Sequence, residues 1–134
     1  HEALPWGRAE VRREGKRVAL LCFGVTLETG LRAAESLDAT VVNMRFVKPL
    51  DEALILELAA GHELLVTLEE NASMGGAGSA VSEFLGSKGL QARVTNLGLP
   101  DVFLEHGTQK EQLADAGLAP DQVAQKILGL LDNR

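Results

Sequence analysis

The feature that most constrains the fold is a continuous apolar segment, residues 18–23, near the start of the chain. Side chains of a strand alternate between its two faces, so a strand that is apolar throughout is stable only where both faces are covered. We therefore interpret this segment as a central strand of a sheet that helices cover on both sides.

Residues 8–14 alternate in polarity and carry charge at Arg8, Glu10, Arg12 and Arg13. With the turn signal at Glu14 and Gly15, the two segments predict an antiparallel hairpin whose first strand is a solvated edge.

The rest of the chain alternates between helical and extended patterns. The expected elements are a helix capped by Thr26 with Leu27, Leu31 and Ala34 on one face, a strand over 39–44, a helix over 52–60, a strand over 64–68, a helix opened by 75–78, a strand over 92–97, a short polar helix over 109–116, and a last helix with a stripe of Val123, Ile127 and Leu130. The helix over 52–60 is apolar on most sides, which predicts that it is largely buried. The alternation predicts the α/β class, with a mainly parallel sheet of about five strands, one antiparallel edge strand and helices on both faces.

Length and composition predict one domain. The chain has 134 residues, of which 46% are hydrophobic, and a chain of this length buries roughly two-thirds of its unfolded surface. Residues 1–7 begin at His1 and show neither periodicity nor signal-peptide character, so we interpret them as the remnant of a linker cut from a longer polypeptide. Residues 8–134 are the expected domain.

Charge and hydropathy argue against two classes of partner. The net charge is -6 and the charges are mixed along the chain, so no basic stripe is present to bind nucleic acid. No apolar segment approaches the roughly 20 residues of a transmembrane helix, so a membrane is not an expected partner. The sequence predicts a cytoplasmic protein. Its one cysteine, Cys22, lies in the apolar strand and is predicted to be a buried structural thiol.

A glycine-rich loop between a strand and a helix is the main candidate for a functional site. The candidate residues are Glu69, Glu70, Asn71, Met74, Gly75, Gly76, Gly78 and Ser79. Backbone N–H groups at such a helix start can bind a phosphate or a carboxylate. However, the spacing matches neither a dinucleotide-binding motif nor a P-loop, and the two glutamates would repel an anion. Two interpretations stay open: an anion-binding loop, or a contact at which another domain or subunit packs closely on the glycines.

The two adjacent carboxylates do not predict an acid/base pair. If the strand persists, the side chains of Glu69 and Glu70 point to opposite faces and cannot reach one substrate atom together. We expect one partly buried, hydrogen-bonded carboxylate and one solvated carboxylate. Glu69 is a candidate proton donor only if another segment brings a cofactor to it.

No other group of residues predicts catalysis or metal binding. His62 and His106 lack a second ligand at metal-binding spacing, and no serine lies in a G-x-S-x-G motif. Arg45 and Lys48 flank Phe46 and can grip an anion, although solvated loop charges are the expectation we favour for them. We therefore predict no catalytic, cofactor-binding or metal-binding residue in this chain.

Longer stretches of the sequence resemble a known family. They are Leu4-Pro5-x-Gly7, Phe23-Gly24 and residues 37–42, 44–51, 67–71, 74–79, 96–101 and 106–109. In this order they resemble the C-terminal (third) domain of the 1-deoxy-D-xylulose 5-phosphate synthases, which belong to the transketolase-like superfamily. The resemblance spans nearly the whole chain but only the last of the three domains of those enzymes.

The resemblance implies a parent enzyme that decarboxylates pyruvate on thiamine diphosphate, held by Mg2+, and joins the two-carbon unit to glyceraldehyde 3-phosphate. The product serves isoprenoid, thiamine and pyridoxal synthesis. In that family the cofactor- and substrate-binding residues lie in the two preceding domains, and none maps onto this chain. The implied role is a structural domain that packs on the preceding domains and contributes to a homodimer. The isolated chain is expected to be inactive and to expose an apolar patch.

Two alternatives stay open beside this interpretation. The chain can be a free-standing α/β module that binds an anion or metabolite at residues 75–79. It can also be a subunit-binding domain of a 2-oxoacid dehydrogenase complex, because similar glycine loops and acidic pairs occur there. Binding of phosphate, pyruvate or triose phosphate would favour the first alternative, and a lipoyl-bearing partner would favour the second.

Overall fold

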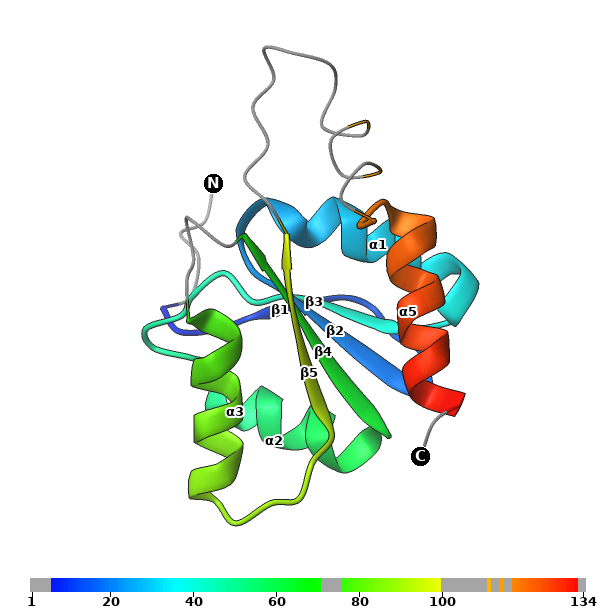
Figure 1. The fold of residues 1–134 in the computed structure, drawn as a ribbon. Helices are drawn as coiled ribbons and strands as arrows, with labels where there is room; N and C mark the ends of the chain where they lie inside the picture. The colour runs from blue at the N-terminus through cyan, green and yellow to red at the C-terminus, as the bar shows by residue number, and fades with distance from the viewer. Residues whose placement is uncertain (1–5, 71–75, 100–110, 112–113, 115–116, 133–134) are drawn as a thin grey trace.

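The computed structural model describes residues 6–70, 76–99, 111, 114 and 117–132. Figure 1 shows a sheet with helices on both faces. The strands are β1 (Glu10–Arg13), β2 (Val18–Cys22), β3 (Thr40–Asn43), β4 (Leu64–Glu70) and β5 (Val94–Leu99), and the helices are α1 (Leu27–Leu37), α2 (Glu52–Gly61), α3 (Ala77–Ser87) and α5 (Pro120–Asp132), with a 3-10 turn at Gly24–Thr26. Most of the expected helix over 109–116 lies outside the described residues.

The sheet has the strand order β1-β3-β2-β4-β5. β2 pairs in parallel with β3 and β4, and β4 pairs in parallel with β5. β1 is the antiparallel edge strand, paired with β3. All five residues of β2 are buried, as expected for a strand that is apolar on both faces. The predicted α/β class, the central position of residues 18–23 and the solvated antiparallel edge are confirmed.

The predicted hairpin between the first two strands is wrong, because β1 pairs with β3 instead of β2. The segment that joins β1 to β2 crosses the start of β3. There, the Lys16 N–H donates to the Asp38 carbonyl at 2.9 Å, and the Gly15 N–H donates to Thr40 Oγ1 at 2.9 Å. A Cβ atom on Gly15 would overlap the Asp38 carbonyl oxygen. Gly15 therefore permits the close approach of the two backbones at this crossing.

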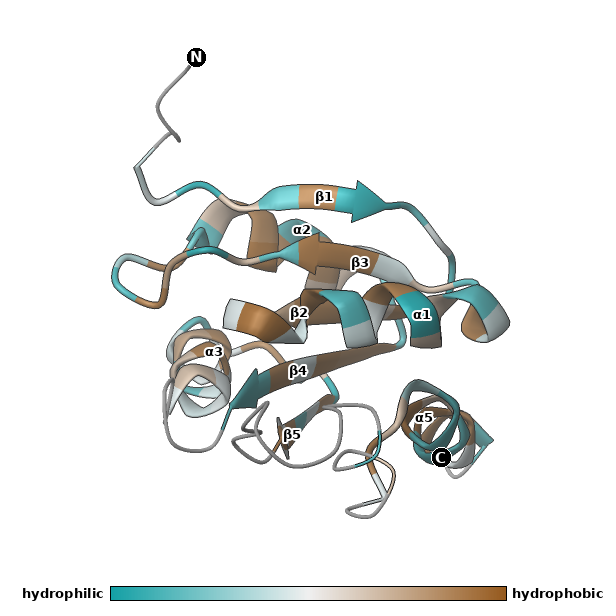
Figure 2. Cartoon of the chain, turned by 90° about the horizontal axis from the view of Figure 1, so that it is seen from above, coloured by the Kyte–Doolittle hydropathy of each residue, from teal (hydrophilic) through white to brown (hydrophobic). Residues whose placement is uncertain are grey.

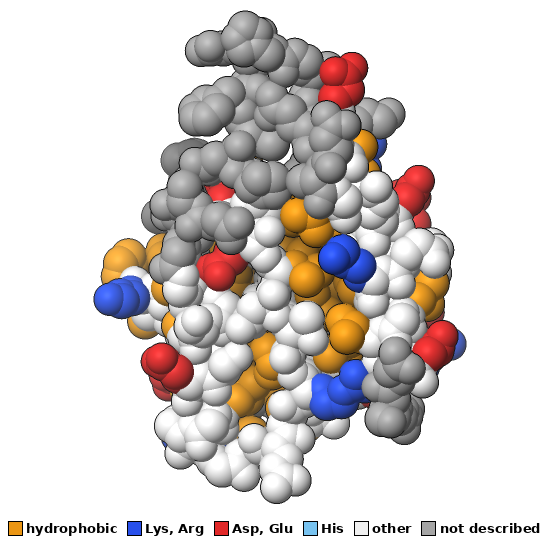
Figure 3. All heavy atoms as spheres, in the orientation of Figure 1, with side chains coloured by type: hydrophobic (Ala, Val, Ile, Leu, Met, Phe, Trp, Pro, Cys, Tyr) orange, Lys and Arg blue, Asp and Glu red, His pale blue; other side chains and the backbone are white. Residues whose placement is uncertain are grey.

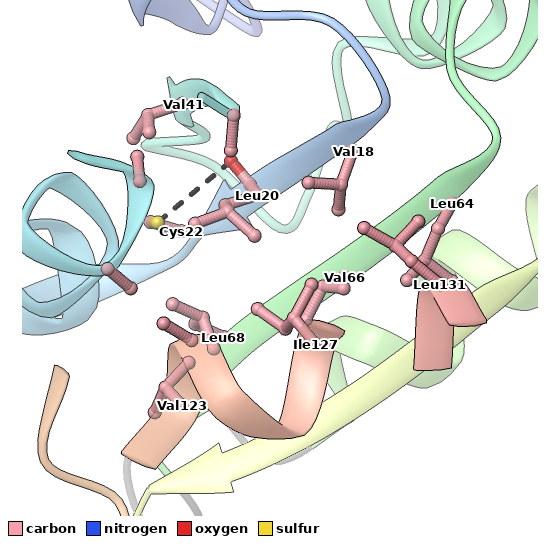
Figure 4. Close-up of a cluster of buried hydrophobic side chains, with 14 residues drawn as sticks. Val18, Leu20, Cys22, Val41, Leu64, Val66, Leu68, Val123, Ile127 and Leu131 are labelled. Carbon is pink, nitrogen blue, oxygen red and sulfur yellow. Dashed lines mark hydrogen bonds between the residues drawn. The ribbon is translucent and has the colours of Figure 1, made fainter. Parts of the chain in front are cut away.

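Two hydrophobic cores lie on opposite faces of the sheet. One core is formed with α1 and α5, and the other with α2 and α3. Figure 2 shows hydrophobic central strands, whereas the edge strand β1 is mostly hydrophilic. Figure 4 shows side chains of α5 meeting those of β2 and β4 in the first core. In α5 the fully covered positions are Val123, Ala124, Ile127 and Leu131, while Leu130 of the predicted stripe is only partly buried.

Two predictions about helices need correction. Thr26 occupies the N-cap position of α1 as expected, but its side chain makes no capping hydrogen bond, because its hydroxyl donates to the carbonyls of Phe23 at 2.8 Å and Leu68 at 3.0 Å. In α2 only Ile55 and Leu58 are buried, so the prediction of a largely buried helix is wrong. A helix that packs on one face of a sheet buries only the stripe of side chains that faces the sheet, so the remaining apolar side chains of α2 stay partly exposed.

In the described part of the chain, no helix is long and apolar enough to cross a bilayer.

Candidate functional site at the start of helix α3

The carboxylate of Glu69 caps helix α3 from a distant position in the sequence. Glu69 Oε2 accepts hydrogen bonds from the backbone N–H groups of Ala77 at 2.8 Å and Gly78 at 3.2 Å. The N-cap position itself is Gly76, which has a φ of +94° and no side chain to offer. The first N–H groups of a helix lack intrahelical partners and lie at the positive end of the helix dipole. Glu69 satisfies two of these groups and places a negative charge there.

Gly78 lies where α3 packs closely on the sheet. Beneath it, the Thr67 hydroxyl donates to Asn96 Oδ1 at 2.7 Å, which joins β4 to β5. A Cβ atom on Gly78 would lie 2.7 Å from Thr67 Oγ1 and 2.7 Å from Asn96 Cγ. The small size of Gly78 therefore permits contact between this helix and its own sheet. Its backbone N–H also donates to Glu69, so the same residue serves packing and capping.

Three of the remaining candidate residues, Glu70, Gly76 and Ser79, lie among the described residues. Glu70 is the last residue of β4 and is partly buried, and strand alternation directs its side chain to the opposite face. Gly76 and Ser79 are exposed, and no described heavy atom lies within 4 Å of the Cβ position of Gly76. Asn71, Met74 and Gly75 lie outside the described residues. The described site is therefore a carboxylate, two backbone donors and a pair of glycines.

This geometry limits what the start of α3 can bind. An incoming phosphate would need the N–H groups of Ala77 and Gly78, which already donate to Glu69. It would also approach the Glu69 carboxylate, and two negative groups at hydrogen-bonding distance repel each other. These contacts weigh against the anion-binding interpretation. They give Glu69 a role in fixing both ends of the connection between β4 and α3.

Asp51 caps α2 locally and also makes a long-range hydrogen bond that the sequence did not predict. Its Oδ1 accepts from the Leu54 N–H at 3.2 Å at the start of α2, and its Oδ2 accepts from the Ala9 N–H at 2.9 Å. The Lys48–Pro49 peptide just before it is cis. An acidic residue before an apolar helix is a typical cap signal, but nothing local indicates the bond to Ala9. Asp51 thus attaches the segment before β1 to α2.

His62 and Arg45 both have structural partners. His62 Nδ1 donates to the Leu58 carbonyl at 2.9 Å, and its Nε2 lies 2.7 Å from Thr40 Oγ1. Arg45 forms an ion pair of 3.3 Å with Glu10, and its side chain is only 15% exposed. The expectation of a solvated Arg45 is therefore wrong, because the edge strand β1 supplies a carboxylate beside it.

Cys22, the last residue of β2, is buried with its side chain against α1, as the sequence predicts for a structural thiol. Burial raises the pKa of the thiol from 9.0 to about 12, and a hydrogen bond with Thr26 opposes this only in part. A Cβ atom on Gly30 of α1 would overlap the sulfur. A thiol with a raised pKa and no access to solvent is unsuited to nucleophilic chemistry.

The sequence matches the family model "Transketolase, C-terminal domain" over residues 7–123. This range includes every described strand and helices α1, α2 and α3, but only the first four residues of α5. The chain belongs to the transketolase C-terminal domain family.

Relatives within this family are similar along nearly the whole chain. The chain is 59% identical to a 1-deoxy-D-xylulose-5-phosphate synthase of Pseudomonas aeruginosa (strain LESB58) over 128 residues, which are 96% of this chain and 20% of that protein. It is 54% identical to the synthase of Thioalkalivibrio sulfidiphilus (strain HL-EbGR7) over 132 residues, 98% of this chain and 21% of that protein. The chain thus spans about a fifth of these relatives and corresponds to their transketolase C-terminal domain.

Solved structures share the fold. A chain described as "Split gene transketolase, inactive beta4 tetramer" superposes with a TM-score of 0.78 at 35% identity, covering 94% of this chain and 43% of that chain. A 2-oxoglutarate:ferredoxin oxidoreductase from Magnetococcus marinus superposes with a TM-score of 0.58 at 16% identity over 92% of this chain and 20% of that chain. The second similarity concerns the fold alone.

The described residues do not fit a site for thiamine diphosphate and Mg2+. Among them, no group of three or more His, Cys, Asp or Glu side chains is placed to hold a metal ion. The start of α3 is the candidate for a diphosphate, and two of its N–H groups already donate to Glu69. We assign no step of thiamine chemistry to the residues of this domain.

Proposed function

We propose that the chain is the C-terminal structural and interface domain of a 1-deoxy-D-xylulose 5-phosphate synthase. The full enzyme would condense pyruvate with glyceraldehyde 3-phosphate, with loss of CO2, on thiamine diphosphate and Mg2+ held by its preceding domains. The product would enter isoprenoid, thiamine and pyridoxal synthesis in the cytoplasm. In this proposal residues 8–134 are the domain, residues 1–7 belong to the connection before it, and the chain alone does not catalyse.

The observation that carries the proposal is the 59% identity to a synthase over 96% of the chain. The chemistry of the site supports the non-catalytic part of it, because Glu69 and Cys22 are committed to contacts within the domain. The solved relative at 35% identity is described as an inactive tetramer. That description concerns a different protein, and it favours a domain that depends on other segments for activity.

Exposed apolar side chains support the role in packing against other segments. Trp6 is 75% exposed and its ring centroid lies 5.2 Å from that of Phe46, while Val25 in the 3-10 turn before α1 is 63% exposed. Large apolar side chains on loops lose contact with water when another domain covers them. They are the surfaces we expect the preceding domains to occupy in the full enzyme.

A domain exchange tests the proposal. The corresponding domain of the Pseudomonas aeruginosa synthase is replaced by this chain, and formation of 1-deoxy-D-xylulose 5-phosphate is measured with pyruvate, glyceraldehyde 3-phosphate, thiamine diphosphate and Mg2+. We expect the chimera to be active, and both the truncated synthase and the isolated chain to be inactive. A folded, soluble chimera without activity, or turnover by the isolated chain, would contradict the proposal.

Calorimetry separates the proposal from a free-standing binding module. Phosphate, pyruvate and glyceraldehyde 3-phosphate are titrated into the isolated chain and into the Glu69→Gln variant. We expect no heat of binding to the native chain, because the Glu69 carboxylate already accepts the hydrogen bonds that an anion would need. Saturable heat with the native chain would favour the binding module.

A further inference from the structure

The segment before β1 lies beside the connection between β3 and α2. Trp6 packs on Phe46, with the ring centroids 5.2 Å apart and the ring planes tilted by 59°. Three residues further along, the Ala9 N–H donates to Asp51 Oδ2 at 2.9 Å. Figure 1 shows the connection between β3 and α2 at the left of the sheet, and Figure 3 shows hydrophobic side chains at the same margin of the molecule. The two segments are distant in sequence and in contact at both ends of the described part of the first one.

Gly7 brings the backbone of this segment close to the connection. Its φ is +71°, in the left-handed region that favours glycine. A Cβ atom at Gly7 would lie 2.9 Å from Pro49 Cγ, closer than side-chain atoms pack in folded proteins. A side chain here would therefore displace the Pro49 ring and also adopt an unfavourable backbone conformation. The absence of a side chain at Gly7 permits the close contact.

Arg45 joins the start of β1 to the same connection. Its guanidinium forms an ion pair of 3.3 Å with Glu10, and its side chain is only 15% exposed. The φ of Arg45 is +60°, which is uncommon for a residue with a side chain. Such conformations persist where surrounding contacts hold them, and they occur most often at functional sites. The ion pair with Glu10 is one of these contacts, so the unusual backbone at Arg45 and the start of β1 are held together.

The Asp51 carboxylate uses its two oxygens for different partners. Oδ1 accepts from the Leu54 N–H at 3.2 Å and caps α2, whereas Oδ2 accepts from the Ala9 N–H. A serine hydroxyl caps a helix about as well as a carboxylate does, so the cap requires only one oxygen. The second oxygen of Asp51 therefore stabilises the position of the segment before β1 rather than the helix.

We propose that residues 44–51 form a clasp that fixes the direction in which the segment before β1 joins the domain, with Asp51 as its positioning residue. A single contact would leave the segment free to rotate about it, whereas the contacts described above hold four of the five residues 6–10. The inference rests on the proposed function in one respect, that this segment leads to the preceding domains of a synthase. There the clasp sets the orientation of this domain on the preceding ones.

The fluorescence of Trp6 tests the clasp, because Trp6 is the only tryptophan of the chain. Time-resolved anisotropy separates tumbling of the whole domain from faster local motion of the ring. We expect tumbling to dominate in the native chain, and Asp51→Ser, which retains a cap for α2, to add a fast local component. Amide exchange at Ala9 should become about tenfold faster in this variant. Gly7→Ala should add the same fast component by moving the segment away from the clasp.

Glu52→Ser is the matched control for Asp51→Ser. It removes a negative charge from the next residue of the same helix start, where the side chain is exposed. The anisotropy of Trp6 and the exchange at Ala9 should stay as in the native chain, and far-UV circular dichroism checks that both variants retain their helices. A dominant fast component in the native chain, or equal Ala9 exchange in the two variants, would overturn the clasp.

The chimeric synthase described above tests what the clasp positions. Asp51→Ser should lower kcat of the chimera by roughly tenfold or more, because small displacements far from the reacting atoms have effects of this size. Glu52→Ser should leave kcat unchanged, and equal kcat for the two variants would overturn the positioning role. An inactive native chimera would contradict the proposed function instead, and the Trp6 measurements on the chain alone would still decide whether the clasp exists.

Discussion

Cys22 lies between the sheet and α1, where water does not reach its thiol. Burial raises the pKa of this thiol from 9.0 to about 12, so the folded domain retains the proton to a higher pH than the unfolded chain does. The contribution of this group to stability is fully present below pH 9 and is lost as the pH rises through the folded pKa. The free energy of unfolding should therefore depend on the titration of this thiol at alkaline pH.

We predict that Cys22→Ala removes part of the alkaline destabilisation. Between pH 9 and 11 the free energy of unfolding of the native chain should fall more steeply than that of the variant, by up to about 1.4 kcal/mol per pH unit. Urea unfolding followed by circular dichroism at several pH values measures both slopes. Parallel slopes would show that the thiol titrates normally in the folded state.

At Glu69 we predict that loss of the carboxylate destabilises the domain through the start of α3. Glu69→Ala leaves two helix N–H groups without their acceptor and should lower the free energy of unfolding by about 1–3 kcal/mol. Glu69→Gln retains an oxygen acceptor and should cost less. Glu83→Ala, at an exposed position of the same helix, is the control and should stay within about 0.5 kcal/mol of the native chain. Equal stability of Glu69→Ala and Glu83→Ala would refute the capping role.

At the scale of the element, helix α3 contains two glycines, one with closely packed atoms at its Cβ position and one with open space there. Gly78 faces the Thr67–Asn96 hydrogen bond with no room for a Cβ atom, whereas no heavy atom lies within 4 Å of the Cβ position of Gly86. Alanine is a better helix former than glycine at both positions. The difference between them therefore comes from packing alone.

We predict that alanine substitutions at these glycines have opposite signs. Gly78→Ala should destabilise the domain by about 1–3 kcal/mol, because the added methyl forces α3 away from the sheet. Gly86→Ala should stabilise it by up to about 1 kcal/mol, because alanine reduces the entropy lost on helix formation. Thermal and urea unfolding of the two variants measure both effects. A stabilising Gly78→Ala would mean that α3 is not held closely on the sheet.

At the scale of the whole molecule, the last helix closes the first core against strands near the start of the chain. Ile127 is fully buried among side chains that include Leu20 and Val66 (Figure 4). The core on this side of the sheet therefore contains side chains from segments far apart in the sequence. Loss of packing in α5 should therefore affect the domain as one cooperative unit.

We predict that Ile127→Ala lowers the free energy of unfolding by about 2–5 kcal/mol through lost burial and a residual cavity. Lys126→Ala, exposed on the same helix, should change it by no more than about 0.5 kcal/mol. Far-UV and near-UV circular dichroism should report one common transition for the native chain and both variants. Separate transitions would show that α5 unfolds independently of the sheet.

The sequence by itself determined the features that depend on periodicity and composition. Residues 18–23 are apolar on both faces, which required a central, doubly covered strand, and the helical patterns between the strands then required a mainly parallel α/β sheet. The burial of Cys22 followed from the same segment. Such patterns record which faces of an element avoid water, and this information is local.

Only the tertiary structure decided which groups meet across the chain. Nothing near Glu14 and Gly15 indicated that β3 would lie between β1 and β2, because pairing depends on an edge supplied by a distant segment. The acceptors for the N–H groups of Ala77 and Ala9 are likewise distant carboxylates, Glu69 and Asp51. The sequence marked the glycine-rich loop as unusual, but a glycine pattern is the same whether the adjacent donors bind a ligand or a carboxylate of the same chain. Only the folded chain shows that these donors bind the carboxylate of Glu69.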